Sequence, residues 1–404
     1  MTDVTGGAAL VSENIRTLPR AIGSNRARPT ARPVPPLAVA ATGLFLLSRL
    51  ITTAGILTAH GMSGLSLRMI LVKWDAHWYL AVAQHGYPTS AAPLPGQAEL
   101  RLAFFPLFPW LLSPIAESGP DAILYATGIG TAFGLAATVA VAYLARTVAL
   151  HRGQEVTTAH RSALAAAVLF ACFPGAVALS LAYTEGLAIV LVVGCLLALL
   201  HRRWLTAGLC AALATASRPN ALALVAPCAW AALEAVRRRR EWRSLLAPVL
   251  APLGYLGYLG YLQVHVGSWR AWHVVEARAW HQDIDFSAHL LRLLSPAELV
   301  RHAARTDWNY FSVVVGLIFV LIAVGCLLRW RPPAVLGAYC AAVLALCFSS
   351  SHVGPRPRMV LLAVPLFLAC ADRLPQRWYR MLLGSCAVLT FAMSYFVSMG
   401  RIIP

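Results

Sequence analysis

The feature that most constrains this chain is a series of apolar runs, about eleven in all, many near the roughly 20 residues that a helix needs to cross a bilayer. Of the 404 residues, 59% are hydrophobic and only 12% are charged. Soluble domains carry about twice that share of charge, so this chain lacks the polar surface of a water-soluble globule. A cytosolic enzyme, a nucleic-acid-binding protein and a disordered protein are therefore excluded. An all-α polytopic membrane protein is expected.

The apolar runs predict the division of the chain into parts. Residues 1–35 are polar and are expected to form a disordered cytoplasmic tail, and residues 36–404 one multi-span membrane domain. The runs at 186–200, 204–217 and 357–371 are short, so we expect them to be tilted, broken or only partly crossing. The expected spans lie near residues 36–58, 121–145, 162–183, 186–200, 204–217, 219–236, 244–264, 309–328, 333–350, 357–371 and 381–400.

The net charge of +17 indicates how the chain is oriented in the membrane rather than nucleic-acid binding, because most of the basic residues lie in short loops between apolar runs. The clearest cue is the arginine run at 237–240. It predicts a cytoplasmic N-terminus and places two long loops, about 59–119 and 265–308, on the exterior face of a cell membrane. Most Asp, Glu, His and Trp residues lie on that face. A simple scaffold would not need this concentration of reactive side chains there.

The sequence WDAHWYLAVAQHGYP at 74–88 has its aromatic and apolar residues at helical spacing, and Gly86 and Pro88 end the pattern. It predicts a short amphipathic helix in the membrane interface, with Asp75 at its start. Asp75 is a candidate for catalysis, although it could instead only cap the helix. The sequence FFPLFPW at 104–110 contains two prolines and is expected to be a second interfacial segment lining a lipid groove, or a hydrophobic re-entrant plug.

Charged residues also stand at or inside span boundaries. Glu185 lies between two spans, and Arg218 interrupts the apolar stretch from 204 to 236. An intramembrane arginine is costly and indicates a functional site, although an Arg218–Glu185 ion pair holding two spans together is the alternative. Arg356 and Arg358 lie at an exterior turn, and their planar forks suit a phosphate. Arg49, inside the first span, either adds to that charge or extends to the headgroups.

The second long loop is rich in aromatic, polar and acidic residues between 269 and 283. This mixture suits sugar binding, and it equally suits an interfacial helix resting on headgroups. All nine cysteines fall inside apolar runs, with no CxxC pair, so neither a zinc site nor a disulfide framework is expected.

The blocks WDAHWYLAVAQHGYP, FFPLFP, LAYTEGL, ASRPNAL and GPRPRMVLLAVPLF occur in this order over about residues 40–375. Together they resemble the bacterial relatives of the PIG-V (GPI mannosyltransferase 2-like) family of GT-C glycosyltransferases. Where such relatives tend to have Pro-Arg-Tyr before the penultimate span, this chain has Pro357, Arg358 and Met359. The arginine of that motif could therefore be Arg356 or Arg358.

The resemblance implies a GT-C-like bundle with an active site on the exocytoplasmic face and a polyprenyl-phosphate sugar, typically mannose, as donor. The acceptor would be a glycolipid, a polysaccharide or a protein. It also implies that the acid of the first exterior loop, here Asp75, is catalytic. No metal or other cofactor is expected, because arginine can neutralise the donor phosphate. The candidates for donor phosphate binding are Arg218, Arg356, Arg358 and Arg49. The candidates for substrate binding are Trp74, His77, Tyr79, Glu185 and His352.

Two other kinds of function fit part of the pattern. A transporter or flippase of lipid-linked glycans also uses intramembrane arginine and glutamate with broken helices. It has little need of two exterior loops rich in Trp, His and acid, so an inverting glycosyltransferase is the preferred hypothesis. A nonenzymatic scaffold is the third.

Overall fold

A computed structural model describes residues 35–90, 96, 98–351 and 354–403. In these residues the ordered elements are nineteen α-helices and six short 3-10 helices, and the one β pairing is an isolated bridge between Ile284 and Ser350. The prediction of an all-α chain is therefore confirmed. Pro36–Pro404 form one unit. The expected tail over residues 1–35 lies outside the described residues except for Pro35 and stays a prediction.

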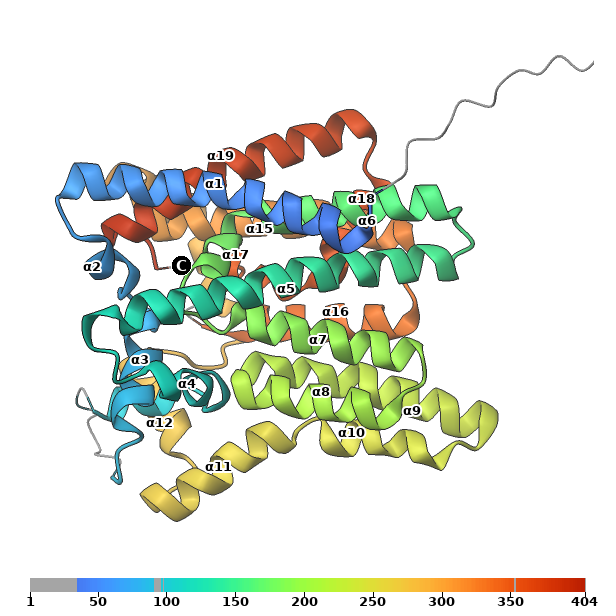
Figure 1. Cartoon of the computed structure of the whole chain (residues 1–404), viewed down its shortest axis with the longest axis horizontal. Helices are drawn as coiled ribbons and strands as arrows, with labels where there is room; N and C mark the ends of the chain where they lie inside the picture. Colours follow the sequence, from blue (N-terminus) through green and yellow to red (C-terminus); the bar gives the residue numbers. More distant parts are fainter. Residues whose placement is uncertain (1–34, 91–95, 97, 352–353, 404) are drawn as a thin grey trace, which may run out of the picture. The chain divides into compact units, whose positions relative to one another are not determined.

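Five helices in the described part of the chain are long and apolar enough to cross a membrane. Figure 1 shows α1, α5 and α7 lying roughly parallel to one another. The five are α1 (Leu37–Ser63), η3 with α5 (Gly119–Asp121 and Ala122–His151), η5 with α9 (Pro219–Leu224 and Val225–Arg239), α15 (Trp308–Trp330) and α19 (Gln376–Met399).

The other expected spans are bent, short or divided. A bend of 81° separates α6 (Val156–Ala171) from η4 (Pro174–Ser180). A bend of 45° separates η6 (Trp242–Leu245) and α10 (Leu246–Leu250), which run on from each other, from α11 (Leu253–Val266). The shorter helices are α7 (Glu185–Leu200), α8 (Trp204–Ser217), α16 (Ala334–Ser349), α17 (Pro357–Val360) and α18 (Val364–Arg373). Every expected span therefore contains helix. Five of them, or seven if each bent pair counts as one span, have the length and hydropathy needed to cross a membrane, so the count of eleven stays a prediction.

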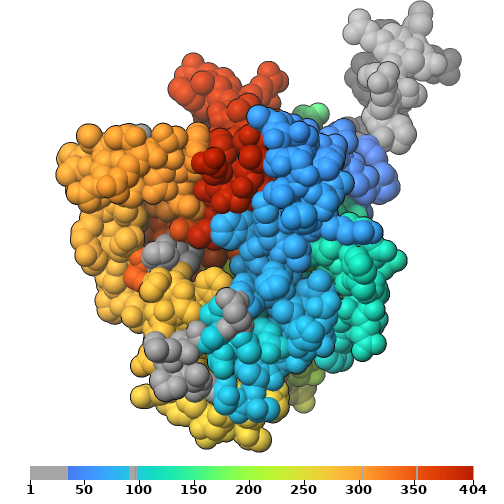
Figure 2. All heavy atoms as spheres, turned by 90° about the vertical axis from the view of Figure 1, so that its left-hand side faces the viewer, coloured from blue at the N-terminus to red at the C-terminus, as the bar shows by residue number. Residues whose placement is uncertain are grey.

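Both long loops contain short helices, which gather at one end of the bundle, on the left of Figure 1. Figure 2 views this end and shows first-loop residues in cyan next to second-loop residues in yellow. The first loop contains α2 (Leu67–Leu71), α3 (Asp75–His85), η1 (Glu99–Ala103), α4 (Leu107–Leu112) and η2 (Ser113–Ile115). The second contains α12 (Ala271–Ala279), α13 (Ala288–Leu293) and α14 (Pro296–Arg305).

The helix predicted after Trp74 is present as α3. It begins at Asp75 and ends at His85, and Gly86 follows with a φ of 65°, a conformation that glycine adopts without steric cost. The predicted start and end of this helix are therefore confirmed. Its position in a membrane interface stays a prediction.

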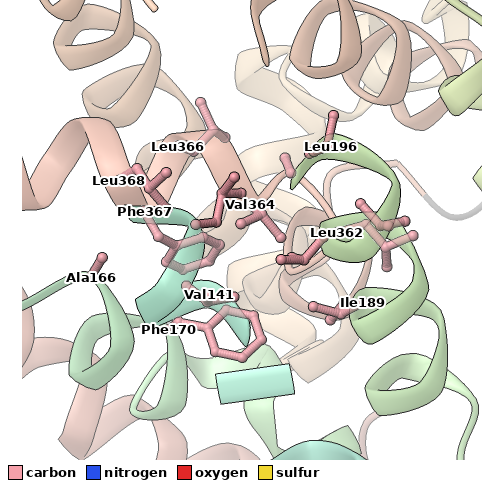
Figure 3. Packing of buried hydrophobic residues seen from close by; sticks show 14 of the residues in the cluster. Val141, Ala166, Phe170, Ile189, Leu196, Leu362, Val364, Leu366, Phe367 and Leu368 are labelled. Carbon is pink, nitrogen blue, oxygen red and sulfur yellow. The ribbon is translucent and has the colours of Figure 1, made fainter. Parts of the chain in front are cut away.

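The largest buried cluster lies between the long helices. The Phe173 ring is tilted against Phe319 and edge-on to Phe367, with centroid distances of 4.5 and 5.1 Å. Figure 3 shows Phe367 and Phe170 packed among smaller side chains such as Val141. Many other members are alanines, whose small size lets helix backbones approach closely. This rigid packing supports the ends of the helices from which the candidate site is built.

Candidate active site

Two acids and two arginines from distant parts of the sequence form one ion cluster. The Arg358 guanidinium donates from Nη2 to Asp75 Oδ2 at 2.5 Å and from Nε to Glu185 Oε1. The Arg218 guanidinium donates from Nη1 to the same Glu185 oxygen at 2.7 Å. The cluster therefore joins α3, the start of α7, the break after α8, and α17. The formal charges of its four members cancel.

Burial differs strongly among the members of this ion cluster. The side chain of Glu185 is fully buried, and those of Arg358 and Arg218 are 6% and 8% exposed. The side chain of Asp75 is 21% exposed. Asp75 is therefore the member through which solvent or a substrate can reach the cluster. The other three form its buried support.

Arg358 reaches Asp75 because glycines let its segment enter the bundle. A Cβ atom on Gly316 of α15 would lie 1.8 Å from the Pro355 carbonyl oxygen, and one on Gly175 of η4 would lie 2.3 Å from the Pro357 carbonyl oxygen. No larger residue fits at either position without moving the backbone. The Arg358 guanidinium also lies 4.6 Å from the centroid of the Tyr183 ring, a cation–π contact that fixes its position.

Asp75 is held from the other side by residues 73 and 74. Lys73 Nζ donates to the Ser398 carbonyl at 2.6 Å, and the Trp74 indole N–H donates to the Val397 carbonyl at 3.2 Å. Both carbonyls belong to the last turn of α19. Trp74 itself has φ 60° and ψ −135°, a conformation that costs a residue other than glycine about 1–3 kcal/mol. The start of α3 is therefore strained and tied to the C-terminal end of α19.

Arg356 lies beside the ion cluster without being neutralised by it. Its side chain is partly buried, and its Nε is buried without a hydrogen-bond partner among the described residues. Burial and the neighbouring Arg358 lower the pKa of Arg356, whereas the more distant Asp307 carboxylate raises it. Its surroundings thus hold a poorly compensated positive charge, which an anionic group would stabilise.

The structure shows the contacts of two residues whose roles the sequence left open. Asp75 is the first residue of α3, and its carboxylate accepts a bond from the Arg358 guanidinium. Arg218 pairs with Glu185, so the expected ion pair between spans is present. Both residues nevertheless belong to the cluster that includes Asp75. The ion pair therefore supports the candidate site as well as the fold.

Arg49 lies in a different environment from the other candidate arginines. Its guanidinium donates to the Ala171 and Ala176 carbonyls and to the hydroxyl groups of Ser48 and Ser180. These partners lie at the end of α6, in η4 and on α1 itself, and the side chain is buried. Its contacts give Arg49 a role in packing α1 against the bent α6–η4 pair.

The candidates for substrate binding differ in position. Trp74 is tied to α19, whereas His77 is exposed with its ring edge against Trp78. Tyr79 is buried between Phe104 and Phe108, with ring centroids at 5.1 and 5.3 Å. Glu185 belongs to the ion cluster. His352 lies outside the described residues.

The FFPLFPW segment packs into the protein. Phe104, Phe105 and Phe108 are buried, and Trp110 is 70% exposed. The phenylalanines contact α3 and α11 rather than an open groove. The position of the segment relative to a membrane, interfacial or re-entrant, stays a prediction.

Sequence reasoning missed Glu276, which lies on α12 within electrostatic range of Asp75. Its spacing of four residues from both Trp272 and Trp280 was the signal that could have found it, because these three side chains share one helix face. Among the described residues, no group of three or more His, Cys, Asp or Glu side chains is arranged to hold a metal ion.

Comparisons with known proteins bear on this site. Residues 46–240, which include Asp75, Glu185 and Arg218, match the model of the family described as Mannosyltransferase (PIG-V). A comparison with curated proteins gives no match.

Solved structures similar to this chain include the oligosaccharyltransferase of Archaeoglobus fulgidus. Its apo form is 14% identical with a TM-score of 0.48, and the match covers 89% of this chain and 56% of that chain. Its complex with an inhibitory peptide and a dolichol-phosphate is 13% identical with a TM-score of 0.43, covering 89% and 55%. This chain therefore spans little more than half the length of that protein.

The apolar helices make this a membrane protein. The family match over residues 46–240 confirms the predicted resemblance to the PIG-V mannosyltransferases and supports the assignment of the chain as a membrane glycosyltransferase.

Proposed function

We propose that the chain transfers a sugar, mannose by family resemblance, from a polyprenyl-phosphate donor to a hydroxyl group of an acceptor on the exocytoplasmic face of the cell membrane. The observation that carries the proposal is the position of Asp75 in the ion cluster. It is the accessible carboxylate of an otherwise buried ion cluster, and the poorly compensated Arg356 lies beside that cluster. A glycosyl transfer needs these two groups together, a base and a cation for the leaving phosphate.

The proposed reaction is a single displacement with inversion. The acceptor hydroxyl gives its proton to the Asp75 carboxylate while its oxygen attacks the anomeric carbon. The bond between that carbon and the phosphate oxygen breaks, and polyprenyl phosphate leaves with the electron pair. Asp75 Oδ1 is the atom available for the proton, because the Arg358 contact is to Oδ2. The proton thus moves to Asp75, and no metal is needed for charge balance.

The arginines divide into two roles in this proposal. Arg358 and Arg218 are engaged by carboxylates, so they position Asp75 and Glu185. Arg356 forms no ion pair with a carboxylate among the described residues, whereas Arg218 and Arg358 both do, so Arg356 is the arginine available to the phosphate. The donor diester carries one negative charge that becomes more concentrated on the leaving oxygen. A guanidinium beside it therefore favours the transition state over the ground state.

The test uses the purified full chain in liposomes with radiolabelled polyprenyl-phosphate mannose and a membrane extract as the source of acceptor. The proposal expects label to move from the donor to a new product, and Asp75→Asn protein to leave it on the donor. Label that crosses the bilayer while staying on the donor would identify a transporter instead. Label that neither moves nor changes would contradict both functions.

A further inference from the structure

One face of α12 carries Trp272 and Glu276 and continues to Trp280, which directly follows the helix. The spacing of four residues places successive side chains one turn apart on the same face. This face points toward the first long loop. Figure 1 places α12 beside α3 and α4 at the same end of the bundle. The two loops therefore meet at a surface made of aromatic rings with a carboxyl group in its middle.

Ring contacts fix both ends of this face. Trp280 lies edge-on to Trp78 of α3 and to Phe104, with ring centroids at 6.2 and 6.1 Å. Trp272 lies edge-on to Phe105 at 5.8 Å. Trp78 is one turn after Asp75 on α3, so the Trp280–Trp78 contact brings α12 next to the catalytic end of α3. Glu276, between the two tryptophans, is consequently held near Asp75.

Two polar groups on this face, both indole N–H groups, lack hydrogen-bond partners among the described residues. The indole N–H groups of Trp272 and Trp280 are both buried, and neither has a hydrogen-bond partner within the described ranges. The Glu276 carboxyl lies near the Trp272 indole without a bond of hydrogen-bonding geometry to it. Unpartnered buried polar groups are costly, and native proteins retain them where a ligand or water satisfies them.

We infer that Glu276 and the indole N–H groups of Trp272 and Trp280 form a subsite for carbohydrate hydroxyl groups beside Asp75. The inference rests on the proposed function and adds to it the part of the site that recognises sugar. A carboxyl with two N–H donors can bond several hydroxyls, and the tryptophan faces can pack on the C–H faces of a pyranose ring. The sugar is either the mannosyl group of the donor or a sugar of the acceptor.

The surroundings of Glu276 give the subsite a pH dependence. Burial raises the pKa of Glu276 to about 8, and the Asp75 carboxylate adds to the shift because two nearby acids resist double ionisation. The other titratable or charged groups on the packed elements are Tyr255, Tyr258, Tyr261 and His265 on α11, His77, Tyr79 and His85 on α3, Glu99 and Arg101 on η1, and His273 and Arg278 on α12 itself. At pH 7 the Glu276 carboxyl is therefore largely protonated and is able to donate a hydrogen bond to a sugar hydroxyl group.

The experiment compares binding of three ligands by the purified full chain. Polyprenyl-phosphate mannose and bare polyprenyl phosphate differ only in the sugar, and a mannose oligosaccharide stands for the acceptor. The variants are Glu276→Leu, which removes the hydrogen bonds, and Glu276→Gln, which keeps a donor and cannot titrate. Glu298→Gln, an acid of the same loop that pairs with Arg301, is the matched control.

We expect Glu276→Leu to bind one of the two sugar-bearing ligands about tenfold more weakly, with bare polyprenyl phosphate unaffected. Loss for the donor assigns the subsite to the transferred sugar, and loss for the oligosaccharide assigns it to the acceptor. Wild-type sugar binding should fall as the pH rises through about 8, whereas Glu276→Gln should keep its affinity across that range. Glu298→Gln should behave as the wild type.

The two proposals fail in different ways. If wild-type protein transfers mannose while Glu276→Leu binds every ligand as the wild type does, the subsite is refuted and the glycosyltransferase proposal stands. If Glu276→Leu loses bare polyprenyl phosphate equally, Glu276 acts on the fold or the phosphate, and the subsite is also refuted. If wild-type protein neither transfers mannose nor prefers either sugar-bearing ligand, both proposals are refuted.

Discussion

The Arg358 guanidinium holds the Asp75 carboxylate at 2.5 Å although the two residues are 283 positions apart in the chain. The same guanidinium also bonds Glu185, so one buried arginine joins the first long loop to the start of α7. In the proposed reaction, Oδ2 of Asp75 is held by this contact and Oδ1 takes the proton. We therefore expect substitutions of Asp75 to affect the reaction, and substitutions of the buried Arg358 to affect the stability of the protein as well.

Asp75→Asn should abolish transfer while the protein still accumulates in the membrane. Asparagine keeps the size of the side chain and can still accept a bond from Arg358, but it cannot take the acceptor proton. A general base contributes about 10²–10⁴-fold to the rate. Initial rates with labelled polyprenyl-phosphate mannose measure the loss. Asp75→Glu should recover little, since a displacement of about 1 Å costs on the order of 10²-fold. An active Asp75→Asn protein would show that Asp75 is not the base.

Arg358→Met should unfold the site as well as inactivate it. Methionine fills part of the space but leaves the fully buried Glu185 with one partner and Asp75 with none. Breaking a buried ion pair by removing one partner costs roughly 3–5 kcal/mol. Thermal unfolding of the purified protein measures the change. Arg218→Met is the matched control, because Glu185 keeps Arg358 and Asp75 keeps its partner; we expect a smaller loss. Equal stability of Arg358→Met and the wild type would contradict the cluster's structural role.

Arg356→Ala should weaken donor binding and leave stability nearly unchanged. Its Nε has no partner in the described part of the chain, so its removal breaks no internal bond from that atom. A charge-assisted contact to phosphate is worth about 1.5–3 kcal/mol, which corresponds to roughly a 10- to 100-fold rise in the dissociation constant. Titration with bare polyprenyl phosphate isolates this contact. Wild-type affinity of Arg356→Ala would remove Arg356 from the phosphate site.

The orientation is tested by labelling two single cysteine variants in intact cells. Arg292→Cys, in the second long loop, should react with an impermeant maleimide, and Arg239→Cys, in the arginine run, only after permeabilisation. Both residues are exposed. Eight of the nine native cysteines are buried, and the ninth, Cys210, is partly buried. The native background should therefore be low. The reverse pattern would place Asp75 on the cytoplasmic side and overturn the exocytoplasmic site.

The sequence was sufficient to predict the helices and the residues of the ion cluster, because apolar length and intramembrane charge are local properties. Each of the four was named as a candidate: Asp75 at the start of an interfacial helix, Glu185 between two spans, Arg218 inside an apolar stretch and Arg358 at an exterior turn. Their mutual pairing was only partly foreseen: the Arg218–Glu185 pair was one alternative, whereas the double role of Arg358 was not considered. Pairing over 283 positions depends on close packing at glycines such as Gly316, which no local pattern encodes.

Other parts of the site could not be read from the sequence. Arg49 and Arg356 both look like surplus positive charge near the exterior face, yet carbonyl groups satisfy Arg49 whereas Arg356 Nε has no partner among the described residues. Which carbonyls lie near an arginine depends on where helices bend, here at the junction of α6 and η4. Trp74 was predicted to stand just before the helix, but its positive φ and its bond to α19 are tertiary features.

Lys73, the one lysine of the chain, should act on the turnover number through the position of Asp75. Its Nζ bonds the Ser398 carbonyl at the C-terminal end of α19, where the helix dipole favours a cation. Together with the Trp74–Val397 bond it holds the strained turn that precedes Asp75. Lys73→Met should therefore lower kcat about tenfold or more with little change in the donor KM, since misplacing a catalytic group affects the chemical step. Lys73→Arg, which can still donate to the same carbonyl, should restore most of the activity. In the Asp75→Asn background Lys73→Met should have no further effect, because residues that act through one group are not additive. A full tenfold loss on top of Asp75→Asn would show that Lys73 acts independently of Asp75.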